Sequence, residues 1–82
     1  MEVRERILTF FAERGLRRDD PDVDQIAYLD AGLLDSMGVV MMIAEFEEAF
    51  EIRFTADDLQ SEEFVTIGGL IGTIERIRAQ SR

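Results

Sequence analysis

The chain has 82 residues, of which 46% are hydrophobic and 33% are charged, and its formal net charge is −9. That length suits a single domain with a modest core, and the hydrophobic content is too high for a disordered chain. Because cysteine, histidine and lysine are all absent, the sequence excludes disulfides, the usual zinc sites, a Ser-His-Asp triad and Schiff-base chemistry. We therefore predict a protein that is not an enzyme.

The negative charge is concentrated in the middle of the chain, where ten acidic residues and a single arginine lie between residues 30 and 64. Such a surface repels nucleic acid and anionic membranes and attracts basic protein surfaces. We see no signal peptide and no hydrophobic run of membrane-spanning length. The sequence thus predicts a cytoplasmic monomer with basic protein partners, no nucleic-acid partner and no membrane span.

The first predicted helix covers residues 3–14. Val3, Ile7, Phe10 and Phe11 recur at helical spacing and form its core stripe. Gly15 follows as the expected residue after the helix end, where a left-handed conformation is common.

A long connection, residues 17–34, comes next. Its acidic run from Asp20 to Asp24 invites comparison with a calcium loop, but Gln25 and Ala31 stand where that loop needs glycine and glutamate. We therefore expect no metal site. Two apolar residues, Ile26 and Leu29, are expected to anchor the connection to the core.

The second predicted helix runs from Ser36 to Phe50, with Asp35 as its N-cap, and it has two apolar faces. The expected core stripe consists of Val39, Met42, Ile43, Phe46 and Phe50. On the other side lie Met37, Val40, Met41 and Ala44, followed by Glu47, Glu48 and Glu51. Because a small domain can hardly bury a helix all round, we interpret this second face as a docking surface with an acidic rim. Burial of its methionines in the core is the alternative.

The rest of the chain predicts a short third helix and a long fourth one. Ile52 and Phe54 are expected to point inward, and Thr55 to Asp58 is close to a capping box. In that short helix Leu59 is the only apolar anchor, and Phe64 with Val65 returns to the core.

The fourth helix begins after Thr66, and its core stripe is Ile67, Leu70, Ile71, Ile74 and Ile77. Gly68 and Gly72 share a face, which we interpret as a place where a neighbouring helix approaches closely; a helix that shifts to admit a chain into the core is the alternative. The predicted fold is all-α, a small antiparallel four-helix bundle formed by residues 1–82 as one domain, with a long first loop.

Ser36 places a hydroxyl at a helix start, where free N–H groups and a partial positive charge suit a phosphate. Taken alone, an Asp-Ser pair is more simply read as a capping sequence. The wider segment, Leu33-Leu34-Asp35-Ser36-Met37 followed by an apolar helix that ends in Glu47-Glu48-Ala49-Phe50, resembles the 4′-phosphopantetheine carrier proteins. The similarity covers roughly residues 3–78.

This resemblance implies an acyl or aminoacyl carrier. A phosphopantetheinyl transferase would move the 4′-phosphopantetheine arm from coenzyme A to Ser36, with Asp35 as helix cap and transferase recognition residue. A loading ligase or acyltransferase would then attach substrates as thioesters, and these enzymes and later ones would use the docking surface, namely Met37, Val40, Met41, Ala44, Glu47, Glu48 and Glu51.

The sequence departs from the pattern usual in housekeeping fatty-acid carriers, which read Asp-Ser-Leu with an acid in the second turn of the helix. Here Met37 and Gly38 follow the serine, and Met41 occupies the second turn. This favours a stand-alone carrier of a specialised pathway, without naming its cargo. Two alternatives stay open: a helical adaptor that binds a partner helix through Met37, Val40 and Met41, and a divalent-metal sensor built on the run from Asp19 to Asp24.

Overall fold

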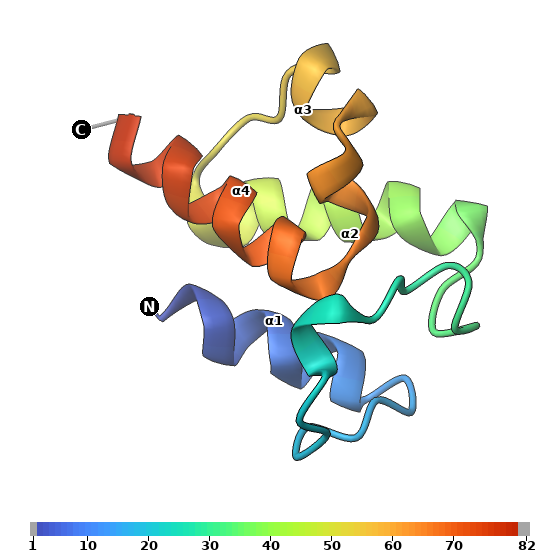
Figure 1. Ribbon diagram of the computed structural model, residues 1–82. Helices are drawn as coiled ribbons and strands as arrows, with labels where there is room; N and C mark the ends of the chain where they lie inside the picture. Colours follow the sequence, from blue (N-terminus) through green and yellow to red (C-terminus); the bar gives the residue numbers. More distant parts are fainter. Residues whose placement is uncertain (1, 81–82) are drawn as a thin grey trace.

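The computed structural model describes residues 2–80 and contains, within that range, four α-helices and two 3₁₀ turns (Figure 1). In chain order these are α1 (Val3–Ala12), η1 (Val23–Gln25), α2 (Ser36–Phe50), α3 (Ala56–Gln60), η2 (Glu62–Val65) and α4 (Ile67–Gln80). Figure 1 shows α2 and α4 running in the same general direction, opposite to α1. The all-α helix-bundle fold is confirmed. Residues 1, 81 and 82 of the predicted domain lie outside the described residues.

The core forms where the apolar stripes of α1, α2 and α4 meet. All five residues of the predicted α4 stripe are buried, as are Met42, Phe46 and Phe50 of α2. The rings of Phe10 and Phe46 join α1 to α2 with their centroids 5.0 Å apart. Val39 and Ile43, which were also expected in the core, are only half-buried, so the core stripe of α2 is narrower than predicted.

The long connection is fixed to the bundle by Tyr28 and not, as predicted, by Leu29. Tyr28 is 2% exposed and its hydroxyl donates a hydrogen bond to the Phe64 carbonyl, whereas Leu29 is 49% exposed. Close by, the Ile67 N–H donates to the Ile26 carbonyl at 3.0 Å. Tyr28 and Leu29 lie together in a turn, in which Tyr28 takes the buried position and Leu29 stays at the surface.

The acidic run of the connection has structural partners. Two hydrogen bonds join the Arg4 guanidinium to the Asp24 carboxylate, at 2.7 and 3.1 Å, and Asp20 Oδ1 accepts from the Asp22 N–H at 2.8 Å. Among the described residues, no group of three His, Cys, Asp or Glu side chains could hold a metal ion. The carboxylates of this run therefore tie the loop to α1 and shape its turn.

Helix α3 has the predicted capping box, because the Thr55 and Asp58 side chains each accept a hydrogen bond from the other residue's backbone N–H. Its expected apolar anchor, Leu59, is 40% exposed, and Val65 of η2, also expected in the core, is 49% exposed. Phe54 and Phe64 fill the core here, with ring centroids 5.4 Å apart. The buried residue of α3 itself is Asp58, so this short helix turns a carboxylate inward and leaves Leu59 partly exposed.

Two glycines of α4, Gly68 and Gly69, lie against 3₁₀ turns and not against a neighbouring helix. A Cβ at Gly68 would come within 2.8 Å of Asp24 in η1, and one at Gly69 would overlap the Glu63 carbonyl in η2. Gly72 has nothing within 4 Å of that position. The predicted pairing of Gly68 with Gly72 is therefore wrong: the close contact is made by Gly68 and Gly69. Separately, no helix within residues 2–80 is long and apolar enough to span a membrane.

Candidate functional site

The loop before α2 is closed by its own backbone. The Ala31 N–H donates to the Ala27 carbonyl at 2.9 Å, and the Leu33 N–H donates to the Tyr28 carbonyl at 3.0 Å. Gly32 takes the left-handed conformation that this turn requires, with φ of 77°. Leu33 and Leu34 then pack, half-buried, against the core, so the chain enters α2 from a fixed position.

Asp35 caps α2 as predicted. Its backbone is extended, with φ of −100° and ψ of −179°, and its Oδ1 accepts from the Gly38 N–H at 2.7 Å. The Asp35 carbonyl also accepts from the Val39 N–H at 3.0 Å. These bonds define the first turn of α2 and therefore the backbone position of Ser36.

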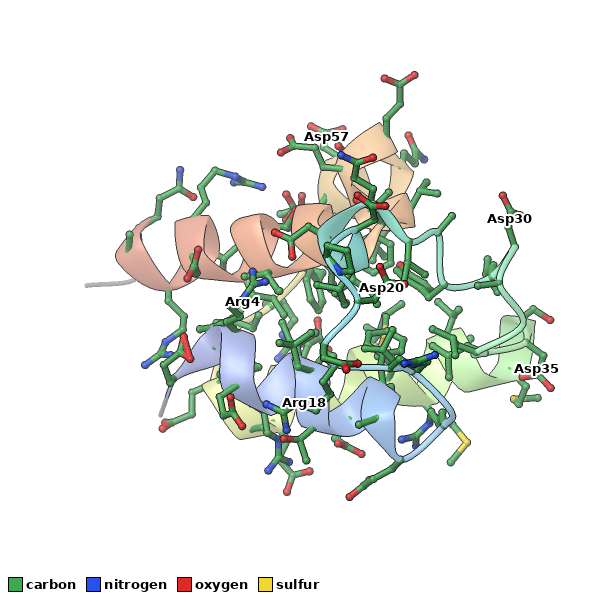
Figure 2. The ribbon with its side chains drawn as sticks, turned by 60° about the horizontal axis from the view of Figure 1, so that its bottom comes forward. Arg4, Arg18, Asp20, Asp30, Asp35 and Asp57 are labelled. Carbon is green, nitrogen blue, oxygen red and sulfur yellow. The ribbon has the colours of Figure 1, made fainter. Side chains whose placement is uncertain are left out.

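Ser36 is exposed at this helix start, and its hydroxyl forms no hydrogen bond with the described residues. Figure 2 shows Asp30 and Asp35 at the same end of the molecule. The chain has no histidine or lysine, so neither residue type is present to act as a base toward the Ser36 hydroxyl.

The outer face of α2, by which we mean Met37, Val40, Met41 and Ala44, is open to solvent. Met37 is 66% exposed, Val40 61% and Met41 67%. These large apolar side chains begin one residue after Ser36 and continue along the helix. The predicted exposure of this face is thus observed, and its methionines do not belong to the core.

The three acidic residues of the predicted rim differ in position. Glu48 and Glu51 are exposed, and Glu51 ends α2 in the left-handed conformation, with φ of 54°. Glu47 is half-buried, and its Oε2 accepts from the Phe54 N–H at 2.9 Å. The inclusion of Glu47 in an exposed rim is therefore corrected: its carboxylate holds the segment after α2.

Sequence reasoning missed an apolar groove of about 340 Å³ beside α2. Its lining residues are Tyr28, Leu29, Val39, Ile43, Leu59, Phe64 and Val65. Five of these had been expected in the core or as anchors to it but are incompletely buried: Leu29, Val39, Ile43, Leu59 and Val65. The sequence did contain a signal for this groove. More apolar residues were predicted to be buried than the core of so small a domain can enclose.

The site fits the phosphate ester of a prosthetic arm. Ser36 presents a free, exposed hydroxyl at the positive end of α2. Residue 38 is glycine, so no side chain at that position crowds Asp35.

Comparison with known proteins agrees with this geometry. Residues 5–74 match the family model described as "Phosphopantetheine attachment site". A D-alanyl carrier protein of Streptococcus suis is 34% identical over 80 residues, which cover 96% of this chain and 100% of the relative. The D-alanyl carrier protein of Streptococcus uberis is 31% identical over 78 residues, covering 95% and 98% of the two chains. The chain belongs to the 4′-phosphopantetheine carrier proteins, a family whose members carry substrates on that prosthetic group and do not transform them.

Proposed function

We propose that Ser36 carries 4′-phosphopantetheine and that the chain presents an acyl or aminoacyl group to partner enzymes. The observation that carries this proposal is the exposed Ser36 hydroxyl at the Asp35-capped start of α2, inside the segment that matches the family. When bound, the arm supplies a thiol that holds the cargo as a thioester. The chain's own contribution is to fix the attachment point and to offer a surface to the enzymes that use it.

Attachment requires a phosphopantetheinyl transferase with its own base. The Ser36 oxygen forms a bond to the phosphorus that bears the pantetheine arm of coenzyme A, the bond to the second phosphate breaks, and adenosine 3′,5′-bisphosphate leaves. The serine proton passes to the transferase, because this chain has no histidine or lysine to take it. We place these reactions in the cytoplasm, where coenzyme A is available.

The cargo we favour is an aminoacyl group such as D-alanine. The relatives are named D-alanyl carrier proteins, and Met41 occupies the second helical turn where housekeeping fatty-acid carriers have an acid. A loading ligase would activate the amino acid and transfer it to the thiol of the arm.

The outer face of α2 is the docking surface that we propose for these enzymes. Its methionines can adapt to several partners because their side chains are flexible. Glu48 and Glu51 would meet basic residues of the partner and mainly raise the rate of association. The surface starts beside Ser36, so an enzyme bound there has its active site within reach of the arm.

The test is modification of the whole chain with coenzyme A and a broad-specificity transferase, followed by intact-mass measurement. Wild type should gain the mass of one phosphopantetheinyl group, and Ser36→Ala should gain none, since Ser36 supplies the oxygen. A labelled Ser36→Ala protein would contradict the proposal. If wild type stays unmodified while a known carrier protein is modified in the same mixture, the exposed outer face favours the adaptor function instead.

A further inference from the structure

Gly38 occupies a position where a helix gains nothing from glycine. It lies in the first turn of α2, two residues after Ser36, and its N–H donates to Asp35 Oδ1 at 2.7 Å. Alanine would keep the same backbone N–H and is far more favourable in a helix. The requirements of the helix therefore do not explain the glycine.

The space around Gly38 does explain it. Cβ atoms of a helix tilt toward its N-terminus, and a Cβ at Gly38 would lie 3.1 Å from Asp35 Oδ1 and 3.1 Å from Leu34 Cδ2. Both contacts are tighter than ordinary van der Waals contact. Leu34 is packed against the core, and Asp35 Oδ1 is the cap atom itself. An added carbon would therefore push the Asp35 side chain away from the helix start.

A shift of Asp35 is transmitted to its covalent neighbour, Ser36. The backbone of Ser36 is placed between the capping residue and the first turn that this cap closes. A serine displaced by a few tenths of an ångström meets a transferase active site less well, because group transfer depends steeply on alignment of the reacting atoms.

We propose that Gly38 is a positioning residue for arm attachment: its missing side chain lets Asp35 close on the start of α2 and so holds Ser36 in place for the transferase. This inference rests on the proposed attachment of the arm to Ser36. Gly38 acts through Asp35 and lies outside the outer face of α2, so it should influence the reaction step more than the docking of the enzyme.

A matched control exists in α4. Gly72 is also a helical glycine, it is exposed, and a Cβ there would meet nothing within 4 Å. Gly72→Ala therefore gives the gain in helix preference without any steric contact. The melting temperature of this variant should rise by about 4–8 °C.

The experiment measures steady-state kinetics of the transferase, with coenzyme A, on wild type, Gly38→Ala and Gly72→Ala, each with a thermal melt. For Gly38→Ala we expect kcat to fall about tenfold, with KM for the carrier unchanged. The melting temperature should stay close to that of wild type, because the helix preference of alanine offsets the weakened Asp35 cap. Gly72→Ala should keep wild-type kinetics.

A wild-type kcat for Gly38→Ala would overturn the inference, as would a rise in KM without a change in kcat. A loss of rate no larger than the fraction of the variant that its melt shows to be unfolded at the assay temperature would also overturn it, because unfolding would then explain the effect. Wild type that is itself unmodified, beside a carrier that is modified, would refute the proposed function and this inference together; a modified wild type with an equally fast Gly38→Ala refutes the inference alone.

Discussion

Asp58 is the side chain that attaches α3 to the rest of the domain. It is 7% exposed, it accepts the Thr55 N–H at 2.9 Å, and its Oδ1 lies 2.5 Å from Arg76 Nη2 on α4. The hydrogen bond from Thr55 lowers the pKa of Asp58 below its ordinary value; Arg76 acts in the same direction, and burial acts against them. The ionised form is therefore the one that stabilises the fold.

The first prediction at this scale is a pH dependence. Because its pKa is lower in the folded state, Asp58 contributes stability that is present above the ordinary aspartate value of about 4 and lost as the pH falls through the folded value. Asp58→Asn should melt below wild type near neutral pH, by the equivalent of about 1 kcal/mol. The difference should shrink as the pH falls from about 5 to about 2.

Asp57→Asn provides the control for this measurement. Asp57 precedes Asp58 on α3, is exposed, and forms no hydrogen bond or ion pair with the described residues; Figure 2 shows it on the outside of α3. The free energy of unfolding of this variant should lie within about 0.5 kcal/mol of the wild-type value. If the difference between wild type and Asp58→Asn stayed constant across the whole pH range, the charge of Asp58 would not be what holds α3.

Single residues were predictable from the sequence where their chemistry is local. The Asp35 cap, the Thr55–Asp58 capping box and Thr66, whose Oγ1 accepts from the Gly69 N–H at 3.0 Å, all depend on neighbours three residues away. Tyr28 was missed because its place depends on the Phe64 carbonyl, 36 residues away in the chain. Nothing within the loop distinguishes it from Leu29 as an anchor.

At the scale of the element, α2 separates the core from the partner surface within one helix. Phe46 and Met42 are fully buried, while Met41, next to Met42 in the chain, is 67% exposed. Each residue advances about 100° around the helix axis, so two neighbours in the chain point to different sides of the helix. The sequence predicted this division from periodicity, but it overestimated the width of the core stripe by including Val39 and Ile43.

The prediction for α2 compares Met41→Asp with Phe46→Ala. Met41→Asp should change the free energy of unfolding by no more than about 0.5 kcal/mol, as expected of a surface substitution. It should strongly reduce arm transfer or cargo loading. Phe46→Ala should cost about 3–5 kcal/mol, because it empties a core position. Each variant is measured by a thermal melt and a loading assay.

The result that contradicts the docking surface is specific. If Met41→Asp were loaded as fast as wild type, partner enzymes would not use this part of α2. Glu48→Lys with Glu51→Lys tests the rim, and it should slow the same step most at low salt, where electrostatic attraction is least screened. Glu47 is left unchanged in that test because its carboxylate holds the Phe54 backbone.

At the scale of the whole molecule, charge opposes compactness. The net charge is −9, and ion pairs such as Arg4–Asp24 and Arg18–Glu5 offset little of it, since both are partly exposed and exposed pairs contribute about 0–1 kcal/mol each. Figure 2 shows Arg4 and Arg18 well away from the end of the molecule that carries Asp30 and Asp35. Repulsion among the acidic residues is therefore poorly compensated near Ser36.

We predict that the melting temperature rises with added salt, and with millimolar Mg²⁺ at constant ionic strength, because counter-ions relieve this repulsion. Salt also weakens the ion pairs, but their small contribution makes that loss the lesser effect. A melting temperature that stays flat or falls between low and moderate salt would show that repulsion is not the dominant electrostatic effect.

The arrangement of the helices could be predicted only where the spacing of apolar residues indicates it. The helices and their core stripes follow from periodicity, and α2 begins and ends at the predicted residues. The contacts of Gly68 and Gly69 depend on how η1 and η2 lie against α4. The groove depends on how η2 and the turn at Tyr28 lie beside α2. Those turns have no periodic signal, so their packing could not be read from the sequence.

Peptide mapping of the modified protein tests whether Ser36 alone carries the arm. Cleavage after Arg18 and Arg53 yields a peptide of residues 19–53, in which Ser36 is the only serine and no threonine occurs. We predict that this peptide alone gains one phosphopantetheinyl group, which fragmentation locates on Ser36. The added mass on the peptide of residues 54–76, which contains Thr55, Ser61, Thr66 and Thr73, would contradict the account.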